Sequence, residues 1–262
     1  IIMDFSRHMN RLIGGPLPLD GAAVKKEMLG VFYPLTSSYI TVEPGMFYRD
    51  FEKITLAKGL ILPCYTASKS LNAMGGMYGN NSAGERTLKY GKTENYILES
   101  KVVFGDGNEY IVRPLSQAGL EKKIAQGDYE GEIYKKIYNL IKENKEELKQ
   151  AKPKVSKNSA GYYIWNVMDS ENKENSWSLF HPSDGSGRLE NSPYYPSQAE
   201  NYFDLNKLLV GSQGTLGIVT EITFRIIPDL KHNKLVAIFL KDLSPLGRLV
   251  EEIRALNPET LE

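Results

Sequence analysis

The sequence has little cysteine and little histidine, and both scarcities exclude kinds of site. Cys64 is the single cysteine, so the chain can form no internal disulfide and no zinc or iron–sulfur site built on cysteine. The three histidines, His8, His181 and His232, do not stand at metal-ligand spacing. We therefore expect no metal site, and we name no catalytic residue. One unpaired cysteine suits a reduced compartment, and we expect it to be a small buried residue.

An excess of charge and long apolar runs are absent as well. The chain balances 32 Lys and Arg against 32 Asp and Glu, so it lacks the net positive charge of proteins that coat nucleic acid or anionic lipid. No apolar run approaches the roughly 20 residues that span a bilayer, and the N-terminal residues do not resemble a signal peptide. We expect no nucleic-acid partner, no membrane-spanning segment and a cytoplasmic location.

What the sequence does have is an alternation of short apolar runs with bends rich in glycine and asparagine. The patterns predict strands at residues 39–42, 60–62, 97–104, 109–112, 218–227 and 235–240, and helices at 46–58, 132–149, 203–210 and 245–256. The Asp106–Gly107 pair between two β-rich runs predicts a hairpin. Residues 169–202 are polar and turn-rich, which indicates a long surface loop or an insertion.

Two glycine-rich bends are candidates for a binding site. The first runs from Ala73 to Gly84 and can take positive φ repeatedly, and the second runs from Gly211 to Gly217 with the spacing G-x-x-G-x-x-G. The second bend leads into a strand, whereas a dinucleotide-binding Rossmann turn needs G-x-G-x-x-G before a helix. What remains is a cradle of backbone N–H groups that can meet a flat or anionic ligand.

Each bend alone is equally well explained as a connection that only needs tight turns. The first bend, however, adds the side-chain amides of Asn80 and Asn81 and the hydroxyl of Ser82, which can donate to phosphate or ring carbonyl oxygens. Two such bends in one small domain favour a shared ligand.

Six segments in a fixed order make a family resemblance visible. They are Val42–Gly45, Gly75–Met77 with Asn80–Gly84, Leu88–Thr93, Gly105–Gly107, Lys157–Tyr162 and Gly211–Glu221. Together they resemble the FAD-binding domain of the vanillyl-alcohol oxidase / p-cresol methylhydroxylase flavoproteins (the PCMH type). The resemblance is greatest to the branch that contains D-lactate dehydrogenase and the glycolate oxidase FAD subunit.

This resemblance implies a fold, a cofactor and a set of binding residues. The fold class is α+β, with a mixed sheet flanked by helices in the second α/β subdomain of the FAD-binding domain. The cofactor is FAD, which backbone donors orient and tune. The implied cofactor-binding residues are Thr66, Ala67, Ser68, Asn72, Gly75, Gly76, Asn80, Asn81, Ser82, Ala83, Gly214, Gly217, Ile218 and Val219.

The sequence also departs from the family pattern. It has no counterpart of the glycine-rich pyrophosphate loop, it carries only a short stretch of the substrate cap, and Ala73 stands where a hydroxyl residue is frequent. We therefore expect a piece of a longer flavoenzyme, with residues 1–228 as FAD-binding domain, 169–202 as a loop insertion within it, and 229–262 as the beginning of the cap. Peripheral contact with a membrane through absent parts stays open.

The function that the resemblance implies is oxidation of a small 2-hydroxy acid, such as D-lactate or glycolate, by hydride transfer to N5 of the flavin. The electrons would pass on to a quinone, a cytochrome or a partner flavoprotein. Two alternatives remain: the same fold acting on a sugar, an alkylglycerone phosphate or an enolpyruvyl sugar, or a truncated binding piece without catalysis.

Overall fold

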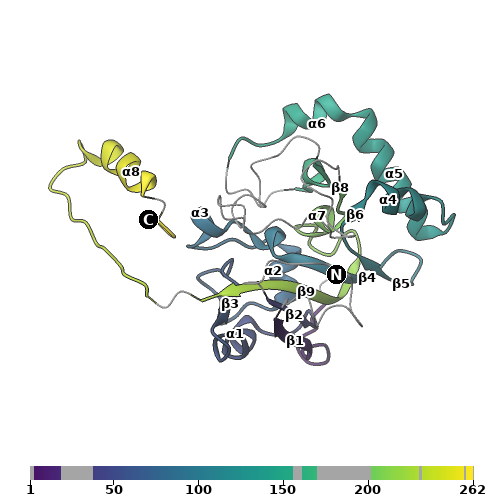
Figure 1. The fold of residues 1–262 in the computed structure, drawn as a ribbon, viewed down its shortest axis with the longest axis horizontal. Helices are drawn as coiled ribbons and strands as arrows, with labels where there is room; N and C mark the ends of the chain where they lie inside the picture. The colour runs from purple at the N-terminus through teal and green to yellow at the C-terminus, as the bar shows by residue number, and fades with distance from the viewer. Residues whose placement is uncertain are drawn as a thin grey trace.

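The structure is a computed structural model that describes residues 3–18, 38–155, 161–169, 202–229, 232–256 and 258–261. Strands and helices share one body, from which a C-terminal arm extends (Figure 1). The fold class predicted from the resemblance, α+β, is confirmed. No helix in these ranges is both long enough and apolar enough to cross a membrane.

The main sheet is built around one long strand, β9 (Ile218–Pro228). Its order is β1 (Leu12–Pro18), β2 (Ser38–Val42), β9, β4 (Ile97–Val103) and β5 (Glu109–Val112), and the short β3 (Leu60–Ile61) also pairs with β9. Every pairing among the described strands is antiparallel, where a mixed sheet was expected. The tight hairpin predicted at Asp106–Gly107 joins β4 to β5, and such a short connection permits only antiparallel neighbours.

A second, smaller unit lies beyond β5. Its sheet has the order β6 (Leu115–Ser116), β8 (Tyr202–Phe203) and β7 (Met168–Asp169), followed along the chain from β6 by helices α4 (Gln117–Ile124), α5 (Tyr129–Glu143) and α6 (Lys145–Ala151). One helix was expected over 132–149, but Asn144 leaves helical geometry and its side chain donates to the Leu140 carbonyl, so the helix divides there. The expected loop at 169–202 lies almost entirely outside the described residues.

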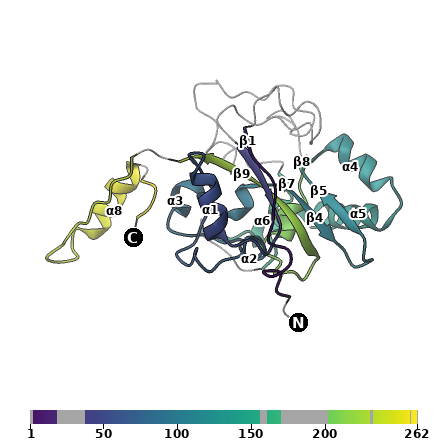
Figure 2. The ribbon, with the colours of Figure 1, turned by 90° about the horizontal axis from the view of Figure 1, so that it is seen from below.

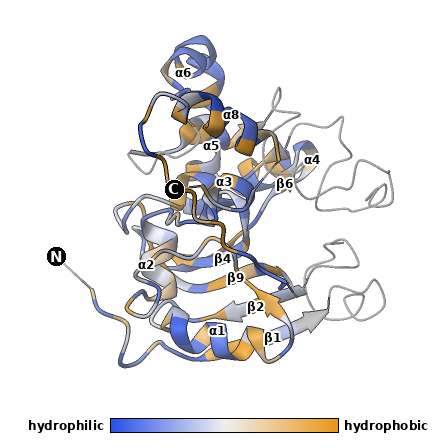
Figure 3. Cartoon of the chain, turned by 90° about the vertical axis from the view of Figure 1, so that its left-hand side faces the viewer, coloured by the Kyte–Doolittle hydropathy of each residue, from blue (hydrophilic) through white to orange (hydrophobic). Residues whose placement is uncertain are grey.

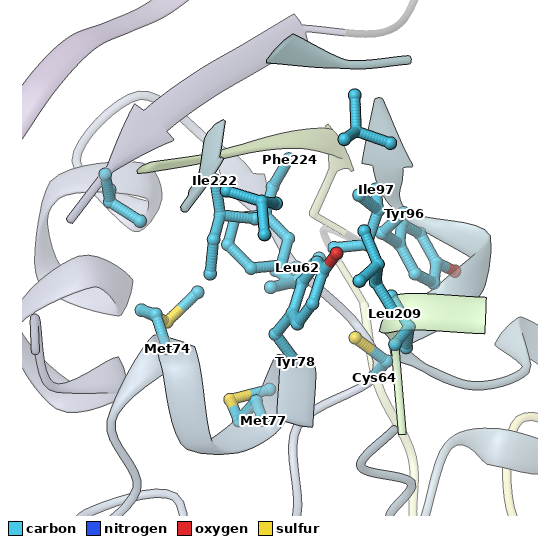
Figure 4. Packing of buried hydrophobic residues seen from close by; sticks show 14 of the residues in the cluster. Leu62, Cys64, Met74, Met77, Tyr78, Tyr96, Ile97, Leu209, Ile222 and Phe224 are labelled. Carbon is cyan, nitrogen blue, oxygen red and sulfur yellow. The ribbon is translucent and has the colours of Figure 1, made fainter. Parts of the chain in front are cut away.

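The core forms where helices α1 (Tyr48–Leu56) and α2 (Met74–Gly79) pack on the main sheet. Phe51 of α1 meets Phe224 of β9 with ring centroids 6.1 Å apart, and Met74, Met77 and Tyr78 of α2 are almost wholly buried (Figure 4). The first glycine-rich bend was expected to be a loop, and this part of it is helical. The three buried residues stand at i, i+3 and i+4, so burying their stripe stabilises the helix despite its glycines.

The described residues also form four short elements: helix α3 (Thr87–Tyr90), the 3-10 turns η1 (Thr93–Asn95) and η2 (Ile164–Asn166), and helix α7 (Asn206–Leu209). The helix predicted over 203–210 is shorter than expected because Phe203 belongs to β8. Figure 3 shows hydrophobic residues along the strands of the main sheet, which is consistent with a core centred there.

The C-terminal arm differs from expectation. Residues 235–240 were predicted to form a strand, but they pair with no strand of the described ranges, and Leu235 and Phe239 are each 93% exposed. An extended segment becomes a strand only when a neighbour satisfies its backbone groups, and no described neighbour lies beside this one. The helix predicted after it is present as α8 (Leu246–Ala255), which stands away from the body in both views (Figures 1 and 2).

Candidate cofactor site

The two glycine-rich bends lie against each other. The backbone N–H of Gly211 donates to the carbonyl of Tyr78 (3.0 Å), and that of Gln213 donates to the carbonyl of Gly79 (2.9 Å). These carbonyls end helix α2, where intrahelical partners run out, so the second bend completes the hydrogen bonding of the first. Segments about 130 positions apart in the sequence therefore form one continuous surface of backbone.

The beginning of the first bend is held by the segment before α1. Tyr48 N–H donates to the Asn72 carbonyl, Met74 N–H to that of Met46, and Gly75 N–H to that of Pro44, at 2.8, 2.8 and 2.7 Å. A Cβ on Gly75 would lie 2.5 Å from the Pro44 Cβ, so this glycine allows the two segments to approach closely. Gly75 therefore packs against the segment before α1 and does not face open space.

Gly76 and Gly214 are the open positions of the two bends. A Cβ built on either would meet no atom within 4 Å, and Gly214 has φ of +76°. Gly217 is different, because a Cβ there would lie 2.6 Å from Cγ1 of Val102 on β4. Ile218 and Val219 then begin β9 opposite Val103 and Val102. Gly76 and Gly214 therefore leave room for a ligand, and Gly217 does not.

Thr66, Ser68 and Asn72 form a closed set of side-chain hydrogen bonds before the first bend. Ser68 Oγ contacts Thr66 Oγ1 (3.0 Å) and donates to Asn72 Oδ1 (3.0 Å), while Asn72 Nδ2 donates to Thr66 Oγ1. Ala67 is exposed between them. Each hydroxyl has one hydrogen and both are used within this set, so the donor left for a phosphate or carbonyl oxygen is the second N–H of the Asn72 amide.

The residues after α2 are placed less openly than the sequence predicts. Asn80 is exposed and Ala83 half-buried, but Asn81 and Ser82 are buried. Asn81 has φ of +47° and accepts the Glu94 N–H at its Oδ1 (3.0 Å), and the Ser82 carbonyl accepts both the N–H and the hydroxyl of Thr93 (3.0 and 2.8 Å). These two residues anchor the bend to η1.

One polar atom of this anchor has no partner within the described residues. The Nδ2 of Asn81 is buried without a hydrogen bond. A buried unpaired amide costs roughly 1–3 kcal/mol unless a ligand or water accepts from it. Together with the open faces of Gly76 and Gly214, this donor suits a cradle for a nucleotide with many acceptor oxygens, so the residues present fit the expected cofactor.

A buried ion pair behind the bends was not foreseen from the sequence. Lys92 Nζ lies 3.2 Å from Glu94 Oε1 and 4.0 Å above the Tyr163 ring, and both charged residues are 7% exposed. Lys207 Nζ donates to the Glu94 carbonyl at 2.6 Å. The pair joins η1, η2 and α7 and so braces both bends. A lysine two positions before a glutamate is too common a pattern to have indicated it.

The aromatic residues near the second bend divide by role. The Tyr163 ring is 2% exposed and packs beside Gly211, and burial raises the pKa of its phenol to about 12. Tyr162 is exposed, and its hydroxyl lies 2.8 Å from Thr215 Oγ1 on the second bend. Tyr163 is therefore a core residue, whereas Tyr162 borders the bend.

Cys64 is inert, as its predicted role as a small buried residue requires. It is fully buried, and burial raises the pKa of its thiol to about 12, so almost no thiolate exists near neutral pH. The Thr93 hydroxyl lies 3.6 Å from its Sγ. A nucleophilic role for this thiol is thereby disfavoured.

Sequence comparisons relate this chain to known proteins. Residues 19–112 match the family described as FAD binding domain. The chain is 24% identical to a D-2-hydroxyglutarate dehydrogenase of Pantoea ananatis over 265 residues, covering 100% of this chain and 21% of that protein. It is 25% identical to the glycolate oxidase subunit GlcD of Bacillus subtilis (96% and 37% covered) and 23% identical to a D-lactate dehydrogenase of Archaeoglobus fulgidus (83% and 31%).

Among solved structures, an alkyldihydroxyacetonephosphate synthase aligns with a TM-score of 0.42 and 14% identity over 85% of this chain and 26% of its own, a likeness too slight to support a conclusion. The chain spans between about a fifth and two fifths of the length of the three curated relatives named. The resemblance predicted from the six segments is nevertheless confirmed: residues 19–112 match an FAD binding domain, and this match indicates FAD as the cofactor.

Proposed function

We propose that this chain serves an FAD-dependent oxidoreductase that oxidises a small 2-hydroxy acid. The observation that carries the proposal is the junction of the two glycine-rich bends, with Gly76 and Gly214 open, in a chain whose residues 19–112 match an FAD binding domain. The substrate class is supported by relatives named for D-2-hydroxyglutarate, glycolate and D-lactate.

The residues proposed to hold the cofactor fall into three groups. Thr66, Ser68 and Asn72 offer a fixed polar surface with the second N–H of the Asn72 amide, and Asn80–Ala83 offer the turn after α2 with the unpaired Asn81 amide. Gly214–Val219 offer backbone at the second bend. FAD supplies the acceptor for the hydride that leaves C2 of the hydroxy acid, while the hydroxyl proton passes to a base and a 2-oxo acid results.

Three further statements belong to the same proposal. Residues 1–228 are the FAD-binding domain, and residues 229–262 begin a substrate cap, a division that suits the exposed arm after Pro228. The partner is a small 2-hydroxy acid. The electron acceptor is a quinone, a cytochrome or a flavoprotein.

Binding is tested by titrating the purified chain with FAD and following the change in flavin fluorescence. Gly76→Val should weaken FAD binding at least tenfold with little change in the free energy of unfolding, because the added side chain enters open space. Gly247→Val is a matched control, since Gly247 is also helical with no atom within 4 Å of a built Cβ. Equal FAD affinity in both variants would contradict the cradle.

The reaction is tested on the natural protein with FAD bound. Anaerobic addition of D-2-hydroxyglutarate, D-lactate or glycolate should bleach the flavin absorbance, and sugars should not. Bleaching by a sugar or by an alkylglycerone phosphate would show that the substrate is not a 2-hydroxy acid. Tight FAD binding without bleaching by any of these compounds would show that the protein binds FAD but does not oxidise them, and it would overturn the proposed oxidation.

A further inference from the structure

The arm that leaves the body after β9 returns to it at one point. Residues 234–247 of the arm are exposed, and the chain then comes back so that Glu259 meets α3 (Figure 1). The Tyr90 hydroxyl donates to Glu259 Oε1 at 2.6 Å, and Lys89 Nζ lies 3.9 Å from the same oxygen. Arg86 Nε lies 3.7 Å from Oε2. Oε1 therefore accepts one hydrogen bond, and each carboxylate oxygen lies within ion-pair distance of a cation.

The three donors converge because of where they stand on the helix. Arg86 is the N-cap of α3, and Lys89 and Tyr90 follow three and four positions later, on the same face. Neither Arg86 nor Tyr90 depends on Glu259 alone for its placement. The Arg86 guanidinium lies 5.4 Å from the centre of the Tyr65 ring, and the Tyr90 carbonyl accepts the Tyr96 hydroxyl at 2.9 Å. The arrangement is thus largely fixed by the body of the protein.

The contacts of the Glu259 carboxylate with the two cations are long. Two cations face one carboxylate, and both ion-pair distances are longer than a direct charge-assisted hydrogen bond of about 2.8 Å. The Arg86 side chain is 15% exposed and that of Glu259 is 20% exposed, so the contact is partly shielded from water. A small free carboxylate could approach both cations more closely than a side chain tethered to the arm can.

We propose that Arg86, Lys89 and Tyr90 form a binding site for the carboxylate of a small organic acid, and that Glu259 occupies this site as an internal competitor. The site directly follows the first glycine-rich bend, because Gly84 N–H donates to the hydroxyl of Thr87 in α3 (2.8 Å). That the organic acid is the 2-hydroxy acid substrate rests on the proposed function; that the site takes a carboxylate rests on these contacts.

Competition by Glu259 should lower the apparent affinity of the site for a free carboxylate by a measurable factor. A carboxylate tethered through the arm is held near the site, and the apparent affinity of a free ligand falls by the fraction of sites that this carboxylate leaves open. Removing the Glu259 charge should therefore raise the apparent affinity for a free carboxylate about tenfold, which corresponds to about 1.4 kcal/mol.

Isothermal titration of the FAD-free chain with glutarate, an unreactive dicarboxylate, tests the site without the reaction. Glu259→Gln should bind glutarate about tenfold more tightly than the parent, whereas Glu252→Gln, which removes an equal charge from the exposed face of α8, should leave binding unchanged. Adding Arg86→Met and Lys89→Met to Glu259→Gln should abolish binding, and adding Lys53→Met, an exposed lysine of α1, should not.

The proposal is overturned if Glu259→Gln binds glutarate no better than the parent, or if binding survives loss of both cations. Should Glu259→Gln fail to fold by circular dichroism, Glu259→Asp, whose shorter side chain reaches the cations less well, gives the same comparison. Glutarate binding in a protein whose flavin no hydroxy acid bleaches would refute the proposed function alone. Bleaching without glutarate binding would refute this site alone.

Discussion

The two glycine-rich bends use glycine for different reasons. In the first bend, Gly75 and Gly84 have φ outside the positive region, yet a Cβ at either would strike another segment. In the second bend, Gly211 and Gly214 have φ of +89° and +76°, and a Cβ at Gly214 would meet nothing. Gly75 and Gly84 of the first bend therefore need glycine for close packing, and Gly214 of the second bend needs it for backbone conformation, whereas Gly217 of the second bend is packed closely like the first pair. The difference predicts how each responds to substitution.

The largest effect is expected at Gly84. A Cβ there would lie 1.8 Å from the Tyr65 carbonyl oxygen, so Gly84→Ala forces two backbone segments apart. We expect a loss of about 3 kcal/mol or more in the free energy of unfolding, measured by urea denaturation. Gly76→Ala, in the same bend but facing open space, is the control. Similar stability of the two variants would remove the packing explanation.

A smaller effect is expected at Gly214. Alanine there adds no clash, but it must adopt a left-handed backbone that costs an L-residue about 1–2 kcal/mol. Gly214→Ala should lower the free energy of unfolding by about that amount in the same assay. A loss as large as that of Gly84→Ala would show that Gly214, too, is limited by packing rather than by its backbone conformation.

Each bend also holds one non-glycine residue at positive φ, which sharpens the comparison. Asn81→Gly relieves the backbone at φ +47° and removes the unpaired Nδ2, but it also removes the acceptor of the buried Glu94 N–H and leaves a cavity at a fully buried position, so we expect a net loss of about 1 kcal/mol. Gln213 has φ of +53°, and no side-chain hydrogen bond is described for it, so Gln213→Gly should stabilise by about 0.5 kcal/mol. Thermal unfolding of both variants should show a lower midpoint for Asn81→Gly and a higher midpoint for Gln213→Gly. A shift in the same direction for both would contradict the roles given to these two side chains.

The smallest effect concerns pH and the flank of the second bend. Asp204, just before α7, is 2% exposed, and burial raises the pKa of its carboxyl despite hydrogen bonds from Asn206 and the nearby Lys207. Because the folded pKa lies above the unfolded value of 3.8, the folded state retains this proton longer. The contribution of Asp204 to stability is therefore lost as pH rises through the folded pKa.

Asp204→Asn should flatten this part of the pH profile of unfolding, measured by urea denaturation from about pH 3.5 to 6. Its amide oxygen can still accept from Asn206. Asp50→Asn, at an exposed site on α1, is the control and should leave the profile of the parent. If the free energy of unfolding of Asp204→Asn still changed with pH as in the parent, the pH dependence would belong to other carboxyl groups.

Much of this fold could be predicted from local patterns. The alternation over residues 218–227 indicated β9, and the Asp106–Gly107 pair indicated the hairpin of β4 and β5, because both signals depend on neighbours in the sequence. The helix α2 was hidden because glycine has a low helix propensity, and three buried side chains override that preference only once the sheet is present. The segment 235–240 has a strand pattern without a described partner, which no local signal reveals.

The candidate site was predictable in its parts and less so in its arrangement. The glycine spacing identified both bends, but it could not separate Gly76, which faces open space, from Gly75, which contacts Pro44. Likewise, nothing local distinguishes the exposed Asn80 from the buried Asn81. The Lys92–Glu94 pair and the convergence of Arg86, Lys89 and Tyr90 on Glu259 depend on contacts between distant segments, for which one sequence carries no signal.

The central place of β9 has a consequence for how this protein can be divided. The strand lies between β2 and β4, although it follows them by more than a hundred positions in the chain. A polypeptide cut to residues 19–112 would keep β2, β4 and β5 and lose the strand that joins them, so we expect it to be unfolded by itself. Autonomous folding demands that synthesis reach at least Pro228, and such late, long-range pairing is expected to make acquisition of the native state slow.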